Sequence, residues 1–427
     1  MLVVVDTLRA DRTSVLGDDP ATTPWLRAAG ARGTVFCQAV APASWTIPSM
    51  AALFAGRDAA GNRHAAHADA PALAERFRQA GYATVGISAN PLLTADNGFA
   101  RGFESFVVAP AASVTDLRAH PAELRAWDAE ALVARALREA AATPRDQPLF
   151  VWLQLMDPHV PYDPANESLA EPQPGWSEPR AQAPHWDAWR PELDEEQAAL
   201  LGGWRRAYDG QVAFADRALA RLEHNWATVR NGKPLLALTS DHGEGLFDHA
   251  RNADSPRGPG PLGEAYDDHG EQLFEESLRV PLVLLGPGVP AGRRELRAVP
   301  TRDLGATLLR LCGVPAQLRA LPLSDDEPAP GLLFGTGTRG WFVRAAEHVL
   351  LAPYPERLDR PGVAPWLLPV APGRALLRQP DQAEREPDVA RALQQALQDW
   401  LSAAGDADAP PPDPATLERL RALGYLR

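Results

Sequence analysis

The chain has 427 residues, of which 45% are hydrophobic and 23% charged, so it is long enough for one large folded core with a smaller appendage. These values exclude a wholly disordered or fibrous chain. The formal net charge of −13 argues against nucleic acid or an anionic membrane as a partner. No apolar run reaches the roughly 18 residues that cross a bilayer.

The first residues predict a buried strand over Leu2–Val5 that ends in the carboxylate of Asp6. No signal peptide is recognisable here, because a charged segment, an apolar segment and a cleavage site are all lacking. A start so close to a core strand leads us to expect further natural residues upstream. The compartment is therefore left open, with a periplasmic or secreted location compatible with such an extension.

After this strand, helical periodicity alternates with short apolar runs. Strands that are apolar on both faces and alternate with helices indicate a mainly parallel sheet covered on both sides, which is an α/β fold. The expected elements are a helix over 71–79, a strand over 83–88, a helix over 122–142, a strand over 149–155, a helix over 195–225, a strand over 235–239, a strand over 280–285 and a helix over 303–312.

Two irregular stretches, at 163–193 and 250–268, have the length of functional loops. A Pro-rich break near 323–331 separates the core from the rest of the chain. We therefore predict a large α/β domain over 1–325 and a small C-terminal α+β subdomain over 326–427, with two short strands at 341–344 and 348–351 and a helix over 387–401.

Three of the expected strands are followed by groups that bind metals. Asp6 ends the first strand, His159 follows the strand over Leu149–Leu155, and the pair Asp241 and His242 follows the strand over 235–239. In open α/β sheets such groups gather at the carboxyl ends of the strands. Two Asp and one His from separate strands favour a divalent metal site. A lone Asp at a strand end is more often a helix cap, so the prediction of a metal site depends on finding all of these residues together.

The segment 44–56 adds a hydroxyl group. Pro48 suits the first turn of a helix and Gly56 suits the position just past its end, so Thr46 is expected at a helix N-terminus. Unpaired backbone N–H groups there favour an anion. The Thr46 hydroxyl is either the N-cap of the helix or a nucleophile that metal coordination activates.

Taken in order, these segments resemble the sulfatase family of the alkaline phosphatase superfamily. The resemblance spans nearly the whole chain, and it implies the sulfatase-type α/β fold with a small C-terminal subdomain that carries a short antiparallel sheet. The similar segments are residues 4–11, 23–24, 45–49, 157–162 and 240–246, with weaker similarity at 98–103, 268–270, 279–282 and 420–426.

The resemblance implies a metal site. Asp6 matches the first metal-binding carboxylate of the family, but Thr7 replaces its usual acidic neighbour. Asp241 and His242 match the pair that completes the site, where sulfatases often have Asn and relatives acting on phosphate commonly have His at the second position. We expect one divalent metal, Ca²⁺, Zn²⁺ or Mn²⁺, bound by these three residues and by Thr46.

The resemblance also implies the residues of group transfer. Thr46 stands where a sulfatase carries the Cys or Ser that becomes formylglycine, and it is expected to attack the substrate. His159 and His269 match positions that contact the transferred group or the leaving oxygen. One of them would protonate the leaving group, and which one is left open.

Departures from the family pattern favour phosphoryl over sulfuryl chemistry. Thr46 cannot be converted to formylglycine, Met50 replaces the Arg that supports the aldehyde, and Lys233, the only lysine, has no matching role. A threonine phosphate can be discharged by water or an acceptor alcohol, whereas a threonine sulfate lacks the exit that formylglycine provides. We expect a hydrolase or transferase acting on small-molecule, glycan-linked or lipid-linked anionic esters. A sulfuric ester hydrolase without formylglycine and a non-catalytic metal-binding protein are the alternatives.

Other polar residues are given structural interpretations first. Arg9 is expected in an ion-paired turn or, alternatively, in contact with substrate, and Asn90 is a weaker candidate for substrate contact. Glu244 and His249 follow the metal pair and would be the ligands of any second metal. The histidines at 64 and 67 are interpreted as solvated loop residues.

Overall fold

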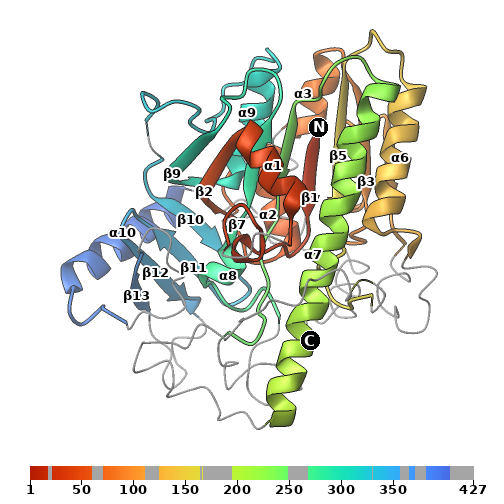
Figure 1. Ribbon diagram of the computed structural model, residues 1–427. Coiled ribbons are helices and arrows are strands. Elements are labelled where there is room, and N and C mark those ends of the chain that lie inside the picture. Colours follow the sequence, from red (N-terminus) through yellow and green to blue (C-terminus); the bar gives the residue numbers. More distant parts are fainter. Residues whose placement is uncertain are drawn as a thin grey trace.

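The computed structural model of the protein describes residues 1–17, 22–59, 71–110, 125–163, 166, 195–248, 268–328, 330–355, 365–370 and 381–403. The core of this described part is a nine-stranded sheet with the order β4-β3-β5-β1-β6-β8-β2-β7, and β9 pairs with β2 (Figure 1). Its strands are β1 (Leu2–Val5), β2 (Thr34–Val40), β3 (Ala83–Ser88), β4 (Ser105–Val108), β5 (Leu149–Leu155), β6 (Leu236–Thr239), β7 (Arg279–Val280), β8 (Leu282–Leu285) and β9 (Arg293–Pro300).

The predicted α/β fold with a mainly parallel sheet is confirmed. Strands β4, β3, β5, β1 and β6 are parallel neighbours, while β8 runs antiparallel to both β6 and β2. The single strand expected over 280–285 is divided at Pro281 into β7 and β8. Proline has no backbone N–H to give to a sheet, which accounts for the interruption.

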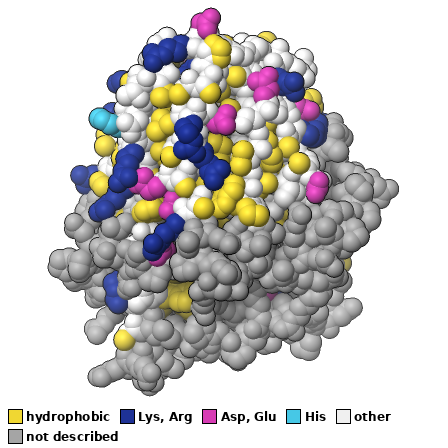
Figure 2. All heavy atoms as spheres, turned by 90° about the vertical axis from the view of Figure 1, so that its right-hand side faces the viewer, with side chains coloured by type: hydrophobic (Ala, Val, Ile, Leu, Met, Phe, Trp, Pro, Cys, Tyr) yellow, Lys and Arg dark blue, Asp and Glu magenta, His cyan; other side chains and the backbone are white. Residues whose placement is uncertain are grey.

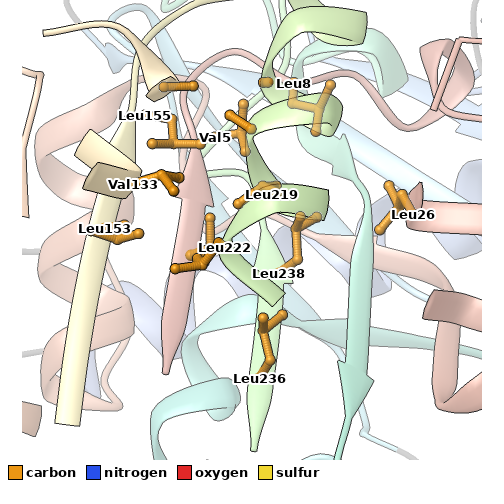
Figure 3. Packing of buried hydrophobic residues seen from close by; sticks show 14 of the residues in the cluster. Val5, Leu8, Leu26, Val133, Leu153, Leu155, Leu219, Leu222, Leu236 and Leu238 are labelled. Atoms are coloured by element: carbon orange, nitrogen blue, oxygen red, sulfur yellow. The ribbon is translucent and has the colours of Figure 1, made fainter. Parts of the chain in front are cut away.

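Helices cover both faces of the sheet, as the apolar strands predict. Leu2 and Val4 of β1 pack into one core with three of the helices, and Val3 and Val5 pack into a second core with three others (Figures 1 and 3). The first set is α2 (Thr46–Ala55), α3 (Leu73–Gln79) and α9 (Leu304–Leu311), and the second is α1 (Pro24–Arg32), α6 (Ala129–Ala142) and α7 (Glu195–Val229).

A small antiparallel sheet follows the large one. It consists of β10 (Leu333–Thr336), β11 (Gly340–Arg344), β12 (His348–Pro353) and β13 (Trp366–Pro369), and α10 (Pro387–Ala403) packs on it. An isolated bridge between Ala43 and Thr336 connects this sheet to the segment that leads into α2. The predicted division of the chain between 325 and 326 stays a prediction.

The surface over α6 and α7 carries Arg, Asp and Glu side chains interspersed with hydrophobic ones (Figure 2). Among the described helices, none combines the length and the hydropathy needed to span a membrane.

Candidate active site at the carboxyl edge of the sheet

Four neighbouring parallel strands, β3, β5, β1 and β6, end at the same edge of the sheet. Asp6 directly follows β1, and Asp241 and His242 follow β6. Asn90 lies just beyond β3, and Gln154 is the next-to-last residue of β5. The fold thus delivers five polar side chains to one place, all of them 2% exposed or less.

Asp6, Asp241 and His242 form a compact cluster. The Nε2 atom of His242 lies 3.7 Å from Asp6 Oδ1 and 3.6 Å from Asp241 Oδ2. One ligand atom from each residue lies within 4.8 Å of the others. The sequence-based expectation that these three residues converge is met by this geometry.

The histidine of this cluster presents a lone pair to the carboxylates. His242 Nδ1 donates to the carbonyl oxygen of Gly243 at 2.9 Å, and burial lowers the pKa of His242. A neutral imidazole that keeps its proton on Nδ1 has its lone pair on Nε2, the atom that faces Asp6 and Asp241.

The two carboxylates are held close together away from water. Burial, with the charge of Asp241 as the next cause, raises the pKa of Asp6 to about 6, and burial raises the pKa of Asp241 to about 7. Asp6 Oδ1 is buried and accepts no hydrogen bond from the described residues. Two carboxylates, an imidazole lone pair and an unsatisfied oxygen together fit a divalent cation.

Thr7, which replaces an acidic residue of the family pattern, is not aimed at this cluster. Its backbone has a φ of +56°, a value that threonine rarely adopts, and its Oγ1 donates to the carbonyl oxygen of Asp6 at 2.7 Å. The Thr7 carbonyl accepts from the Tyr208 hydroxyl at 2.8 Å, which holds the strained turn. The turn brings the Thr7 backbone N–H to the carboxylate of Asp241.

Thr46 is the first residue of α2 and is fully buried. Its Oγ1 lies 3.2 Å from His242 Nε2 and 3.3 Å from Asn90 Nδ2, and its side chain also hydrogen-bonds to Asp241. The N-cap residue is Trp45, so the Thr46 hydroxyl is directed at the acidic cluster rather than at its own helix.

The position of α2 is fixed from both sides. Ser49 Oγ donates to the Asp241 carbonyl at 2.5 Å, which ties the first turn of the helix to the end of β6. Gly56 ends the helix with a φ of +66°, as its predicted place just past the C-terminus requires. Met50, also buried in α2, lies in the core that covers one face of the sheet.

Two amides contribute contacts that the sequence did not reveal. Asn90 Nδ2 donates to Asp6 Oδ2 at 2.7 Å, in addition to its contact with Thr46, so its role is wider than the substrate contact considered for it. Gln154 Nε2 lies between the two carboxylates, 3.2 Å from Asp6 Oδ2 and 3.4 Å from Asp241 Oδ2. The sequence feature that could have pointed to this contact is the polar residue Gln154 within the otherwise apolar run Leu149–Leu155.

His159 and His269 both lie beside the cluster. The ring of His269 is centred 4.4 Å from that of His242 and 5.1 Å from that of His159. His159 is half-buried, and its Nδ1 lies 2.6 Å from the Val160 carbonyl oxygen. His269 is buried, and its Nδ1 lies 3.1 and 3.2 Å from the two carboxylate oxygens of Glu244.

Nearby charged residues have structural roles. Arg9 is 1% exposed, donates to both carboxylate oxygens of Asp11 at 2.9 and 2.7 Å, and pairs with Asp248, so the ion-paired turn is observed. Asp157 accepts a hydrogen bond from the backbone N–H of Ala129 at the start of α6, and burial raises its pKa to about 7. The histidines at 64, 67 and 249 and most of the loops at 163–193 and 250–268 lie outside the described residues.

The fold and the site define a class of protein: an α/β enzyme with a buried acidic cluster beside a hydroxyl group at a helix N-terminus. The family model described as Sulfatase matches residues 1–314. The chain therefore belongs to the sulfatase family, a family of ester hydrolases in the alkaline phosphatase superfamily. A comparison with curated proteins gives no match.

Solved structures share the fold over almost the whole chain. The phosphonate monoester hydrolase of Silicibacter pomeroyi is 18% identical, with 94% of each chain covered and a TM-score of 0.63. That of Agrobacterium radiobacter is 19% identical, with 94% of this chain and 95% of the other covered and the same TM-score. A protein solved with its substrate D-glucosamine-2-N,6-O-disulfate is 15% identical, with 96% and 98% covered and a TM-score of 0.68.

Proposed function

We propose that this protein cleaves phosphate esters, by hydrolysis or by transfer to an acceptor alcohol, with Thr46 as the nucleophile. The observation that carries the proposal is the placement of the Thr46 hydroxyl, which lies at the start of α2 within hydrogen-bond reach of His242 Nε2 and Asn90 Nδ2. The hydroxyl faces the acidic cluster and lies at the N-terminus of α2, where backbone N–H groups without helical partners favour an anion. An anionic ester bound there would lie against the hydroxyl and these N–H groups.

The choice of phosphorus over sulfur is based on Thr46 itself. Phosphonate monoester hydrolases and proteins acting on sulfated substrates share this fold, so the fold favours neither chemistry. Threonine cannot become formylglycine, and a sulfate ester on its hydroxyl would have no aldehyde-forming exit. A phosphate ester on the same oxygen is open to in-line attack by water or an alcohol. This reasoning ranks phosphate first and sulfate second.

Asp6, Asp241 and His242, with the hydroxyl of Thr46, are the residues that would hold a divalent cation. When bound, such a cation lowers the pKa of a hydroxyl and neutralises charge on the transferred group. Asn90 keeps Asp6 and the Thr46 hydroxyl in register, because its amide donates to both. Gln154 does the same for the two carboxylates, whose like charges would otherwise repel each other.

Side chains of the protein carry out the bond-making and proton-transfer steps. Thr46 Oγ1 forms a bond to phosphorus while the bond to the leaving oxygen breaks, and an imidazolium, His159 or His269, gives that oxygen a proton. The helix N-terminus faces the equatorial oxygens of the phosphoryl group during transfer. A water or an alcohol then displaces Thr46, its proton goes to the imidazole, and Thr46 Oγ1 is released in the ionised form in which it attacked.

The proposal is tested with one leaving group on three kinds of ester: 4-nitrophenyl phosphate, bis(4-nitrophenyl) phosphate and 4-nitrophenyl sulfate. We expect turnover of at least one phosphate ester and little of the sulfate. A preference for the sulfate would reverse the order of the two chemistries. Failure on all three, in protein loaded with Zn²⁺, Mn²⁺ or Ca²⁺, would favour the non-catalytic alternative.

A second measurement tests the nucleophile. Intact-mass spectrometry of protein quenched during turnover should show the mass of a phosphoryl group on wild-type protein and none on Thr46→Ala. The Ala variant should lose on the order of 10⁴-fold or more in kcat, the scale seen when a catalytic nucleophile is removed. Thr46→Ser is the matched control, since it keeps the hydroxyl and should keep the adduct.

A further inference from the structure

Glu244 forms a buried pair with His269. The side chains of both residues are almost fully buried, with Glu244 1% and His269 3% exposed. Both carboxylate oxygens of Glu244 lie at hydrogen-bond distance from Nδ1 of His269, at 3.1 and 3.2 Å. This geometry places a proton on Nδ1 and leaves Nε2 as the ring nitrogen for any other partner.

The backbone holds Glu244 rigidly in this position. The N–H groups of Gly243 and Glu244 donate to the carbonyls of Ser277 and Glu276 in α8 (Glu275–Leu278), at 2.8 and 3.1 Å. A side chain at Gly243 would stand 1.8 Å from the Glu276 carbonyl oxygen, so only glycine permits this approach. The Glu244 carbonyl, in turn, accepts from the buried guanidinium of Arg9 at 3.0 Å.

His269 is fixed from the other side. Its backbone N–H donates to Asp268 Oδ1 at 2.7 Å, and the carbonyl of the next residue, Gly270, accepts from Ser44 Oγ at 3.1 Å. Ser44 lies two residues before Thr46, so the same contact ties the histidine to the entrance of α2. The backbone beside His269 is thus connected to the nucleophile segment, and the ring of His269 lies beside that of His242.

We propose that Glu244 is the positioning residue of the general acid and that His269, rather than His159, is this acid. The inference rests on the proposed function and deepens it. The two histidines differ in what holds Nδ1: a buried carboxylate for His269 and a neutral carbonyl for His159. A carboxylate stabilises the imidazolium that must give up a proton, and it fixes which nitrogen gives it.

Thr46 Oγ1 enters the reaction ionised, its proton having gone to solvent; as it bonds to phosphorus, the bond from phosphorus to the leaving oxygen breaks, the electron pair stays on that oxygen, and Nε2–H of the His269 imidazolium protonates it. In the second step water attacks phosphorus, its proton returns to Nε2, and the bond from phosphorus to Thr46 Oγ1 breaks, which leaves Thr46 ionised again. Glu244 accepts a hydrogen bond from Nδ1–H throughout.

The test is the dependence of the rate on the leaving group. Glu244→Gln keeps the size of the side chain but removes the charge that stabilises the imidazolium. We expect kcat for phenyl phosphate, whose leaving group needs a proton, to fall about 10²-fold, the lower end for general acid catalysis. For 2,4-dinitrophenyl phosphate, which leaves readily as an anion, the loss should stay below about threefold.

Glu295→Gln is the matched control, because Glu295 is equally buried but paired with Arg293 and Arg297 on β9. It should leave the ratio of the two rates unchanged. An equal loss on both esters in Glu244→Gln, or no loss on either, would overturn the proposal. A loss confined to phenyl phosphate in a His159→Gln variant, and not in His269→Gln, would also overturn it.

Two further measurements separate this inference from the proposed function. Long-range ¹⁵N–¹H spectra of histidine-labelled protein, with His269→Gln used for assignment, should show the proton on Nδ1 of His269; a proton confined to Nε2 overturns the inference whether or not the protein turns over substrate. Glu244, Asp268 and His269 also lie close enough to hold an ion. Two metal ions per wild-type chain, with one lost in Glu244→Gln, would make Glu244 a ligand and overturn the positioning role.

Discussion

Two buried acidic groups lie beside the short segment that follows β1: the Asp6–Asp241 cluster, and Asp248, which pairs with the guanidinium of Arg9. In the first group, burial raises the pKa of Asp6 and of Asp241, and their contacts are amides, a hydroxyl and a neutral imidazole. In the second, burial also acts to raise the pKa of Asp248, but the charges of Arg9 and Arg205 and a hydrogen bond from Arg9 together outweigh it, and the pKa of Asp248 falls.

The difference is that Asp248 meets a cationic side chain of the fold, Arg9, whereas the described contacts of Asp6 and Asp241 include no Arg or Lys. Arg9 is 1% exposed and makes its ion pairs within the chain, so the second group is complete as a structural element. The first group combines negative charge with an unsatisfied oxygen on Asp6. A buried cluster of this kind is stable only when it takes up protons or a cation.

The largest effect is expected from removing the ion pair between Arg9 and Asp248. Asp248→Asn removes the buried carboxylate that pairs with Arg9 and Arg205, while Arg9 keeps its contacts with Asp11, and it should lower the free energy of unfolding by about 3 kcal/mol, the lower end for a broken buried pair. Asp241→Asn should instead leave the chelator-treated protein as stable as the wild type or more stable, because it removes a buried charge that has no cation. Urea unfolding in the presence of EDTA measures both.

The contrast fails if the two variants lose similar amounts of stability. It also fails if Asp241→Asn binds metal with wild-type affinity, as followed by calorimetric titration with Zn²⁺ or Mn²⁺. Far-UV circular dichroism of both variants establishes that a loss of binding is not a loss of fold.

Much of the fold follows from the sequence, because apolar runs in a covered parallel sheet are conspicuous. The strands Ala83–Ser88 and Leu149–Leu155 have the predicted bounds, and the helices expected over 195–225 and 303–312 are observed as α7 and α9. Seven α-helices and strands of the described residues were not predicted: α1, β2, β4, α8, β9, β10 and β13. Among them β2 contains Gln38 and lies between antiparallel and parallel partners, so its pattern is less regular.

The expected ends of strands and of one helix suggested Asp6, His159, Asp241, His242 and Thr46, whereas His269 was suggested by the family resemblance alone. The proximity of Asp6, Asp241 and His242 could be predicted from their positions, because neighbouring parallel strands end at one edge of the sheet. The contacts of Asn90 and Gln154 with Asp6 could not be predicted. A single polar residue does not indicate which carboxylate it will contact 84 or 148 positions away in the sequence. The Glu244–His269 pair likewise depends on a loop geometry that periodicity does not encode.

Metal removal should weaken the folded state measurably. A cation that binds only the folded protein, present at 100 times its dissociation constant, adds about 2.7 kcal/mol to the free energy of unfolding. Chelation should therefore lower the wild-type melting temperature, and it should leave that of Asp241→Asn unchanged. A wild-type melting temperature that is unchanged both by EDTA and by added Zn²⁺, Mn²⁺ or Ca²⁺ would contradict the presence of a cation site.

In the chelated protein the stability should fall as the pH rises. The pKa of Asp6 is about 6 and that of Asp241 about 7 in the folded state, both above the ordinary value of 3.8. Between about pH 4 and 7 the folded chain therefore holds protons that the unfolded chain has lost. Each such group lowers the free energy of unfolding by up to about 1.4 kcal/mol per pH unit in this window.

The measurement is urea unfolding of wild type and Asp241→Asn at pH 5, 6 and 7, with chelator present. The difference between the two proteins should shift in favour of the variant as the pH rises, and it should level off above about pH 7. A difference that is constant across the window would show that Asp241 titrates normally. Saturating metal should flatten or reverse the wild-type trend, because the bound cation favours the ionised carboxylates.

The smallest effect is expected at Gln154, whose amide bridges the two carboxylates. Gln154→Leu removes this bridge, while Asn90 still holds Asp6 Oδ2 at 2.7 Å. Because one of two amide contacts to Asp6 survives, the metal affinity should fall by about tenfold, the lower end for residues that support ligands. The matched control is Gln211→Leu, a buried glutamine of α7 that contacts Asp163 and Asn166 instead. If calorimetry gives the same affinity for both variants, Gln154 serves packing, and the carboxylates keep their arrangement through the backbone of β1 and β6 alone.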